Sequence, residues 1–425
     1  MLLLKIVPLF LVVAPCPARP ALRDNGPKPL GHSATTLIGL LLLAAASCER
    51  SAPVCRFGAE YRLFQSGAQV FHDLRTLSLG QGMLALFSDT SGVHVMPLDG
   101  QGAPQGPARR LFDACDGGLD ADNGASVVHV ACVRRGEPPR SAGDRLSSEG
   151  SRPSGASAPG EVVLYALDPK LAVRELARFG HAGRISTGIA LARSDGGSLA
   201  LAWHDAAVSG SRIWFVEPDR MRDPRQLSDD GWEASAPSLA RHAGRLYACW
   251  AETRFNGERA ESRIRVAAVG SYEAGRVVLS SRDPAPSPRL AAAPDGLILS
   301  FRDKRESLRK TGLYLARVDA TGRLKGQVVR AGRADGQASP VLEPCLGGVV
   351  SATPRTFAGD YFVGVTRADT ELRRLSREQQ FYEDSREFDR VAVHCERDQA
   401  VLLIGERGRL LRGSAALRST TFRCD

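Results

Sequence analysis

Lysine is scarce in this 425-residue sequence, because six of its 56 basic residues are lysine and the others are arginine. The formal net charge of +9 alone would fit a nucleic-acid-binding protein. However, the arginines are scattered among 47 acidic residues, without a dense basic run or interleaved aromatic side chains. We therefore expect no nucleic acid among the partners of this protein.

Several sequence signatures of enzymes and cofactor sites are also missing. The sequence has no Cys-x-x-Cys spacing, no Gly-x-Ser-x-Gly elbow, no His-Glu-x-x-His motif and no phosphate-binding glycine loop. The dispersed histidines include His94, His129 and His394, which alternate within apolar runs, where structural roles are more common than metal binding. We predict neither a metal site nor a cofactor.

No apolar run is long enough for a confident membrane span, which needs about 20 residues. The two longest runs cover residues 2–13 and 37–46, and the second leads into Leu43-Ala-Ala-Ala-Ser-Cys48. This ending resembles the lipobox of bacterial lipoprotein signal peptides. The resemblance implies a leader over 1–47 and attachment of lipid to Cys48, which would anchor the chain in a membrane. Glu49 in the next position favours the outer membrane, whereas a cleaved secretory signal or a short helical anchor remains an alternative.

One stretch of the chain recurs with variations, and its clearest copy runs from Ser235 to Glu252. Two later copies share its proline, and Pro237, Pro288 and Pro340 are separated by 51 and then 52 residues. Short apolar or alternating runs between Gly, Asp and Ser turns predict consecutive antiparallel strands within each period. A period of this size built from strands is typical of the blades of a β-propeller.

Seven copies are visible, so we predict an all-β fold, a seven-bladed β-propeller of four-stranded antiparallel blades. Six or eight blades are the alternatives, because the first and last copies are the least regular. A single sheet of this size cannot bury both of its faces. We therefore expect Trp203, Trp250 and Phe301, which end the same strand in three copies, to fill the wedges between blades. Alternation in Arg263-Ile-Arg-Val-Ala267 predicts a strand with one wetter face.

The predicted propeller covers residues 67–424, and a lipid-anchored tether over 48–66 precedes it and could supply one closing strand. The seventh copy is interpreted as strands at 391–395, 401–404, 410–411 and 420–423. Residues 136–160 are rich in Gly, Pro, Ser and Arg and almost free of apolar side chains. This composition predicts a disordered insertion between two strands of one blade.

Export would permit disulfides among the seven cysteines that follow Cys48. Sequence alone does not determine their connectivity. We favour Cys55 with Cys424, because these residues lie at the two ends of the folded region, where a ring must be closed. The next predicted pairs are Cys115 with Cys132 and Cys345 with Cys395. Cys249 lies beside Trp250 in an apolar strand and is expected to be a buried free thiol.

The repeat resembles the sialidase-like propellers that carry Asp-box, or BNR, repeats. The resemblance rests on a proline before the inner strand, Gly-x-Leu before the second strand and an aromatic residue at its end. Two loops that correspond to the Asp box, Leu98-Asp-Gly-Gln-Gly102 and Val318-Asp-Ala-Thr-Gly322, keep a turn-forming Asp and Gly. Ser228-Asp-Asp-Gly-Trp232 is closer to the motif but falls between repeats. The resemblance implies that the loops after the second strands share one face with the loops that enter the first strands.

Arginine recurs after the second strand in five repeats, accompanied by acids and one histidine. The predicted binding residues on this face are Arg135, His204, Asp205, Glu252, Arg254, Arg302, Asp303, Arg355 and Arg407. A ring of guanidinium groups would suit a carboxylate or sulfate ligand. In the alternative interpretation, which we favour, these arginines form salt bridges with acids between adjacent blades.

Sialidase-type hydrolysis, which the resemblance would imply, needs three converging arginines, an aspartate acid and a tyrosine nucleophile activated by a glutamate. Tyr382 and Glu383 are adjacent, and neighbouring residues of a strand point to opposite faces, so no catalytic residue can be named. We interpret the chain as an exported, lipid-anchored binding or scaffolding module of the cell envelope, with an envelope protein or an anionic glycan as its partner. The alternative is a carbohydrate-active glycoside hydrolase that uses the same arginine-rich face.

Overall fold

The computed structural model describes most of the compact unit Ala52–Asp425. The described residues are 53–68, 70–79, 82–113, 115, 118–122, 126–135, 160–180, 184–193, 197–207, 210–217, 223–257, 259–269, 275–281, 286–306, 310–334, 339–357, 360–382, 387–396, 399–407 and 414–424. The predicted leader, Cys48 and all of the predicted insertion except Gly160 lie outside them. Within these ranges every regular element is a β-strand, and no helix suited to crossing a bilayer is found.

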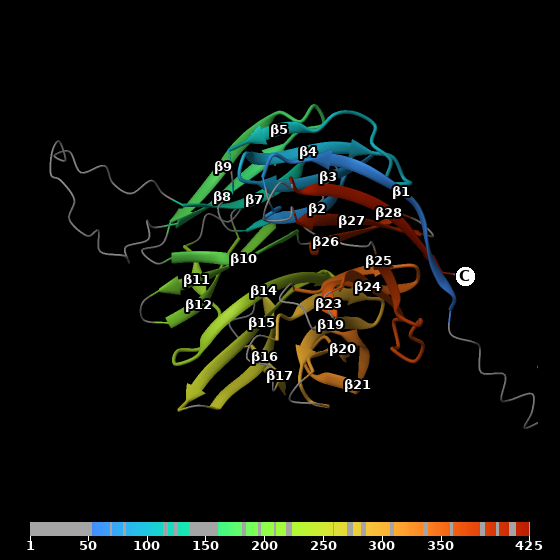
Figure 1. Cartoon of the computed structure of the whole chain (residues 1–425). Coiled ribbons are helices and arrows are strands. Elements are labelled where there is room, and N and C mark those ends of the chain that lie inside the picture. Colours follow the sequence, from blue (N-terminus) through green and yellow to red (C-terminus); the bar gives the residue numbers. More distant parts are fainter. Residues whose placement is uncertain are drawn as a thin grey trace, which may run out of the picture. The chain divides into compact units, whose positions relative to one another are not determined.

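The strands form seven four-stranded antiparallel sheets, arranged as the blades of a seven-bladed propeller (Figure 1), which confirms the predicted fold class and blade number. Blade 1 contains β2 (Asp73–Leu79), β3 (Gly82–Asp89), β4 (Gly92–Leu98) and β5 (Arg109–Phe112). Blade 2 contains β6 (Leu119–Asp122), β7 (Val128–Arg135), β8 (Gly160–Leu167) and β9 (Val173–Gly180). Blade 3 contains β10 (Arg184–Arg193), β11 (Leu199–Ala207), β12 (Gly210–Val216) and β13 (Arg225–Gln226).

Blades 4 to 6 continue in the same order along the chain. Blade 4 contains β14 (Glu233–His242), β15 (Arg245–Asn256), β16 (Arg259–Val269) and β17 (Arg276–Ser281). Blade 5 contains β18 (Arg289–Ala293), β19 (Gly296–Asp303), β20 (Gly312–Val318) and β21 (Leu324–Arg333). Blade 6 contains β22 (Val341–Cys345), β23 (Gly348–Phe357), β24 (Asp360–Asp369) and β25 (Gln379–Tyr382). The first strand of each blade is the innermost, and it begins directly after Pro288 in blade 5 and after Pro340 in blade 6. Proline is tolerated at these positions because the start of an inner edge strand needs no ladder donor.

The seventh blade takes its strands from both ends of the chain. It contains β26 (Glu387–Glu396), β27 (Gln399–Arg407) and β28 (Ala416–Cys424), and its fourth and outermost strand is β1 (Cys55–Gln65). β1 pairs with β28 from Cys55 opposite Cys424 to Gln65 opposite Ala416, and Figure 1 shows the two strands side by side. Residues 55–65 belong to the predicted tether, which could supply one closing strand, and they form such a strand as part of the ring. The strand predicted at 410–411 lies outside the described residues.

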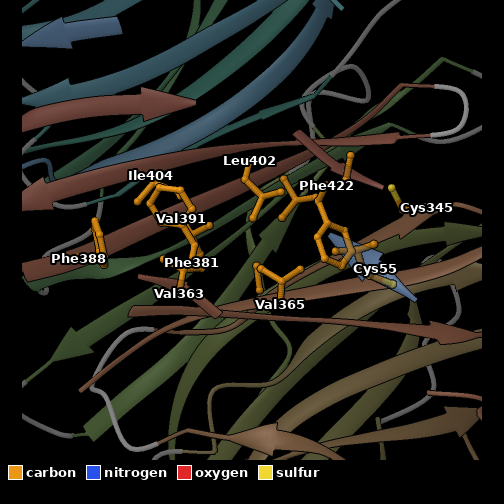
Figure 2. Close-up of a cluster of buried hydrophobic side chains, with 14 residues drawn as sticks. Cys55, Cys345, Val363, Val365, Phe381, Phe388, Val391, Leu402, Ile404 and Phe422 are labelled. Atoms are coloured by element: carbon orange, nitrogen blue, oxygen red, sulfur yellow. The ribbon is translucent and has the colours of Figure 1, made fainter. Parts of the chain in front are cut away.

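Apolar side chains pack between neighbouring blades and form a cluster at each of the seven junctions. Figure 2 shows the junction of blades 6 and 7, where Val363 and Phe381 meet Leu402 and Phe422. The predicted wedge residues Trp203, Trp250 and Phe301 are fully buried between blades 2 and 3, 3 and 4, and 4 and 5, respectively. Burial of each blade against its neighbours is the reason why the repeats fold as a ring.

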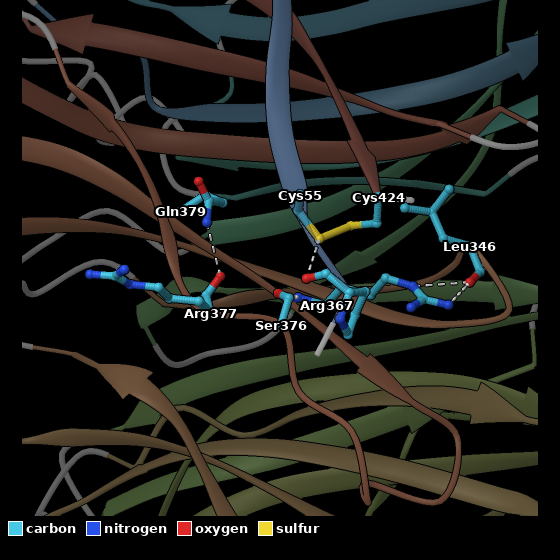
Figure 3. Close-up of a disulfide and its surroundings, with 8 residues drawn as sticks. Cys55, Leu346, Arg367, Ser376, Arg377, Gln379 and Cys424 are labelled. Atoms are coloured by element: carbon cyan, nitrogen blue, oxygen red, sulfur yellow. Dashed lines mark hydrogen bonds between the residues drawn. A yellow bond between two sulfur atoms is a disulfide. The ribbon is translucent and has the colours of Figure 1, made fainter. Parts of the chain in front are cut away.

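The structure forms all three predicted disulfides, and the remaining described cysteine, Cys249, is a buried free thiol as expected. Cys55 and Cys424 join the ends of β1 and β28 (Figure 3), close to Arg367, whose guanidinium donates to the Leu346 carbonyl oxygen. The Cys345 disulfide connects β22 to β26 of the next blade. Two of the three bridges therefore strengthen the seventh blade, where the ring closes.

Four turns between third and fourth strands are built around an aspartate: Asp99 in blade 1, Asp168 in blade 2, Asp319 in blade 5 and Asp369 in blade 6. The carboxylates of Asp99 and Asp319 each accept backbone N–H groups two and four residues further on, as the degenerate Asp-box loops predicted. Asp168 forms the same turn in blade 2. There the left-handed residue is Leu171, with φ 61°, instead of a glycine. The sequence pattern missed this turn because it depends on Asp and backbone geometry, and the glycine that normally signals it is absent.

Candidate functional site

All nine predicted binding residues lie on second strands, near the ends that point to one face of the ring. Second strands end and third strands begin on this face, which we call the candidate face. The residues are distributed as Arg135 on β7, His204 and Asp205 on β11, Glu252 and Arg254 on β15, Arg302 and Asp303 on β19, Arg355 on β23, and Arg407 on β27. The structure thus brings them to one face but spreads them over six blades, one strand away from the hub.

The arginines of the candidate face are held by carboxylates of their own blades. Arg355 is 2% exposed and forms a bidentate pair with Glu378, in which Nη2 lies 3.0 Å from Oε2. Arg407 contacts Glu387 at 3.4 Å, and the Nη2 of Arg254 lies 2.6 Å from Oε2 of Glu261.

The salt bridges expected between adjacent blades are therefore found within blades at these three positions. Arg254 lies directly opposite Glu261, and Arg407 directly opposite Glu387, because adjacent antiparallel strands place these opposite charges side by side. Glu378 precedes β25 and reaches Arg355 across Gly364 of β24.

The other predicted residues have different surroundings. Asp303 is buried and accepts from Arg305, two residues further on, at 2.7 Å. The backbone N–H of Arg302 donates to the Pro286 carbonyl oxygen. Burial lowers the pKa of His204 to about 4, so that its imidazole is neutral at pH 7, and the neighbouring Asp205 is also buried. The side chain of Arg135 lies outside the described part of the chain.

Glu252 is the centre of a buried charge network in blade 4. It is 0% exposed, and its carboxylate accepts from Trp250 Nε1 at 2.8 Å and from the Asp229 backbone N–H at 3.1 Å. Arg263 donates to the same carboxylate at 2.7 Å, and Arg265 approaches it at 3.5 Å. Both arginines also contact the Asp229 carboxylate.

The alternation of Arg263 and Arg265 predicted a strand with one solvent-exposed face, but in the structure the side chains on this face are largely shielded from solvent. The two arginine side chains are 19% and 7% exposed. Glu252 and Asp229 supply two carboxylates for these two guanidinium groups, so that the charges of the covered site are paired. Sequence reasoning selected Glu252 and missed its partners, since Asp229 is distant in sequence and precedes the repeat unit.

A pocket of about 400 Å³ opens on the candidate face between blades 3 and 4. Its walls are the start of β12 with Arg212, the loop from Asp229 to Glu233, and the end of β15 with Arg254 and Phe255. Trp232, from the motif set aside between repeats, lies in this loop. The guanidinium carbons of Arg254 and Arg263 are 4.6 and 3.8 Å from the centroid of its ring, so cation–π contacts fix the indole. Phe255 is 60% exposed at the rim.

The charges around this pocket are nearly balanced. Arg212 donates to Asp230 at 2.8 Å, and the four arginines near the pocket face five acids. These charged residues are Arg212, Arg254, Arg263, Arg265, Asp229, Asp230, Glu233, Glu252 and Glu261. Such a site has no net attraction for an anion, but it offers many fixed donors and acceptors beside an exposed aromatic ring.

Within the described ranges, no group of three or more His, Cys, Asp or Glu side chains could hold a metal ion. The histidines of the apolar strands contact protein groups instead. His94 stacks on Phe87 with a centroid distance of 5.3 Å and lies 3.4 Å from Asp89, whereas His129 contacts Arg193. These contacts give the two histidines a structural role.

No protein-family model matches the sequence. No curated protein matches it either. Solved structures are similar in fold. The polysaccharide lyase Uly1 superimposes with a TM-score of 0.50 at 10% identity, over 87% of this chain and 99% of that one.

Two further structures are similar at lower scores. Trypanosoma rangeli sialidase in complex with sialic acid has a TM-score of 0.42 at 12% identity, over 88% of this chain and 59% of the sialidase. The parainfluenza virus 5 hemagglutinin-neuraminidase ectodomain has a TM-score of 0.44 at 9% identity, over 91% and 94%. At such identities the likeness concerns the propeller fold alone and carries no activity to this chain.

Proposed function

We propose that this chain is an exported β-propeller that is anchored in the bacterial cell envelope through a lipid on Cys48 and acts there as a binding module. The observation that carries the proposal is the pocket between blades 3 and 4, where Phe255 is exposed beside charged groups that are already fixed by one another. A preformed pocket with an aromatic side chain and fixed polar groups is suited to ligand binding.

The charge balance of this pocket bears on the chemistry of the ligand. An anionic glycan was one expectation from sequence, together with an envelope protein. Because the arginines at the pocket are neutralised by acids, we favour an uncharged, hydroxyl-rich ligand, a neutral glycan of the envelope or of its surroundings. Phe255 would cover the apolar face of a sugar ring, while groups such as Arg212 and Asp230 would exchange hydrogen bonds with hydroxyls.

Hydrolysis by a sialidase-like mechanism is the alternative, and the geometry of the candidate face does not favour it. That mechanism needs three arginines on one anion and suitably spaced acid and nucleophile groups. Arg254, Arg355 and Arg407 each contact a carboxylate within their own blade. Their guanidinium groups are therefore engaged at three separate places.

A glycan array followed by calorimetry would test the binding proposal on the full chain in detergent. We expect Phe255→Ala to weaken the affinity for the best glycan about tenfold, because an exposed aromatic anchor contributes about 1–2 kcal/mol to binding. Tyr382→Ala is the matched control, since Tyr382 is 49% exposed on blade 6, and it should leave the affinity unchanged. Equal effects of the two substitutions would argue against this pocket, and new reducing ends during incubation would favour the hydrolase.

The anchor is tested by replacing Cys48 with serine and labelling growing cells with a fatty-acid analogue. We expect the wild-type chain to take up the label and to fractionate with the outer membrane, whereas Cys48→Ser should remain unlabelled and uncleaved. Cys16→Ser removes a cysteine from the predicted leader and should behave like the wild type. Acylation of the Cys48→Ser variant, or recovery of unlabelled wild-type protein in the cytosol, would contradict the lipoprotein interpretation.

A further inference from the structure

The chain enters the ring on the face opposite to the candidate face, which we call the tether face. β28 is the third strand of its blade, so it begins on the candidate face at Ala416 and ends on the tether face at Cys424. β1 runs antiparallel to β28, and Cys55 lies opposite Cys424. The disulfide between these two cysteines fixes the entry point of the chain on the tether face (Figure 3).

With the proposed lipid on Cys48, a bilayer lies near this entry point. Cys55 follows Cys48 by seven residues, and an extended chain covers at most about 3.6 Å per residue, so the reach of this segment is about 25 Å. β1 has 11 residues and rises about 30 Å from the tether face to the candidate face. Because the reach is shorter than the strand, the candidate face cannot lie flat on the bilayer, whereas the tether face can.

Exposed arginines surround the entry point. They belong to the ends of β1 and β28 and to the turn between β24 and β25 of the neighbouring blade, and they are Arg56, Arg423, Arg373, Arg374 and Arg377. β1 packs on this blade through Phe57, whose ring centroid is 5.6 Å from that of Phe381. Figure 3 shows Arg377 in the surroundings of the disulfide. The two ends of the ring and the turn of blade 6 therefore form one basic surface.

The arginines of this surface differ in their partners from those of the candidate face. Arg423 donates to the amide oxygens of Gln399 and Gln101 at 2.7 and 3.1 Å. Within the described ranges, no ion pair is found for Arg374 or Arg377. On the candidate face, by contrast, three arginines each contact a carboxylate of their own blade. The positive charges of the tether face are therefore less neutralised by the protein itself.

The acids beside the entry point are engaged in turns and ion pairs. Glu371 lies 2.5 Å from Arg317 of blade 5 and 3.9 Å from Arg373, which is 81% exposed. Asp369 accepts the Arg373 backbone N–H at 2.8 Å, and Asp99 closes the corresponding turn of blade 1.

The charges around the entry point add up to a positive excess. The described side chains here comprise seven arginines and three acids, namely Arg56, Arg317, Arg367, Arg373, Arg374, Arg377, Arg423, Asp99, Asp369 and Glu371. Asp425 follows Cys424, lies outside the described residues and would lower the excess by one charge. Such a surface suits a partner with many negative charges.

We propose that the tether face docks on a bilayer that contains anionic lipids, with the arginines around the entry point on the lipid phosphates. The inference rests on the proposed anchor at Cys48. A lipid within about 25 Å raises the effective concentration of headgroups at this surface, so that a modest basic patch is sufficient for docking. Val54, which is 67% exposed directly before Cys55, would enter the interface beside the anchor.

This orientation bears on the ligand of the proposed glycan pocket. Docked through the tether face, the propeller holds the pocket between blades 3 and 4 on the side away from the bilayer. Its ligand would therefore come from beyond the anchoring membrane, and the headgroups of that membrane would not reach it.

Sedimentation with lipid vesicles tests the docking surface separately from the anchor. Residues 52–425 form one compact unit that contains every described strand and all three disulfides, so this unit can be used without residues 1–51. We expect it to prefer vesicles of phosphatidylcholine with phosphatidylglycerol over phosphatidylcholine alone at least tenfold in about 0.05 M salt. The preference should disappear in about 0.5 M salt, where the Debye length is about 4 Å.

Two triple variants locate the surface. Arg373→Gln/Arg374→Gln/Arg377→Gln should lower the partition onto anionic vesicles at least tenfold, because each basic side chain near an anionic surface contributes roughly a factor of five. The matched control is Arg62→Gln/Arg178→Gln/Arg330→Gln, which removes the same charge from exposed side chains nearer the candidate face. It should leave the partition unchanged, and both variants should keep the melting temperature of the parent protein.

The outcomes separate the docking surface from the anchor. Since the tested unit lacks Cys48, a failure of acylation would leave these results unchanged and would remove the anchor alone. Equal partition onto neutral and anionic vesicles, a preference that persists in high salt, or equal effects of the two triple variants would each overturn the docking surface and leave the lipid on Cys48 as proposed.

Discussion

Replacing Glu252 with alanine is expected to lower the free energy of unfolding by about 3–5 kcal/mol, because one half of a buried ion pair is then removed. The side chain is 0% exposed and accepts from Trp250, Arg263 and the Asp229 backbone N–H. Without it, Arg263 and Arg265 share a single carboxylate in a covered site. Urea denaturation monitored by tryptophan fluorescence would measure the loss.

The exposed pair of Glu261 and Arg254 provides the matched comparison on the neighbouring strand. Glu261 is 50% exposed, and surface pairs contribute about 0–1 kcal/mol, so Glu261→Ala should change the free energy of unfolding by less than about 1 kcal/mol. Glu252→Gln keeps the volume and part of the hydrogen bonding and should fall between the two. If Glu252→Ala and Glu261→Ala were equally mild, the buried network would not be what stabilises this blade.

The Glu252→Ala substitution is also expected to affect the proposed pocket between blades 3 and 4. Arg263 lies over the Trp232 ring, with its guanidinium carbon 3.8 Å from the centroid, and Glu252 holds Arg263 in that place. Loss of Glu252 should therefore weaken glycan binding as well as stability, although Glu252 itself is buried beneath the pocket. Glu252 is a positioning residue, and Glu261→Ala should leave the Arg263 contact with Trp232 in place.

The fold was predictable from sequence because the signals for it are local and repeated. Pro237, Pro288 and Pro340 mark the inner strands, and Trp203 and Trp250 mark the interblade wedges. What the repeat could not show is pairing between distant residues. β1 completes a sheet whose other strands lie at the opposite end of the chain, and a periodic pattern contains no information about this partner.

The candidate site was predictable only in its position on the ring. The repeat predicted these residues in the loops after the second strands, whereas they lie on the second strands themselves, because the strands extend beyond their apolar segments. The partner of each arginine depends on side-chain packing, and so does the burial of Arg263 and Arg265.

Of the three disulfides, the one between Cys55 and Cys424 is expected to lower the free energy of unfolding most when it is removed. This bridge joins residues 369 positions apart, whereas the Cys115–Cys132 bridge joins residues 17 apart. In the chain-entropy account, the longer loop contributes roughly 2–3 kcal/mol more to stability, and the whole effect is about 6 kcal/mol. Cys55→Ser/Cys424→Ser should therefore lower the free energy of unfolding more than Cys115→Ser/Cys132→Ser, as measured by urea denaturation without reductant.

Removal of the Cys55–Cys424 disulfide should also have a local structural effect, which a general loss of stability would not produce. β1 is the outermost strand of its blade, and it contributes Phe57 to the cluster around Phe381 and Phe422. Without the bridge, hydrogen exchange should accelerate in β1 and β28 before it does so in blades 2 to 5, because the ring opens where its two ends meet. Cys249 should stay unreactive towards maleimide while blade 4 is folded, since burial raises the pKa of its thiol to about 12. Uniform acceleration of exchange in all blades, or a milder effect than that of the Cys115–Cys132 variant, would show that β1 does not close the ring in the way its pairing with β28 indicates.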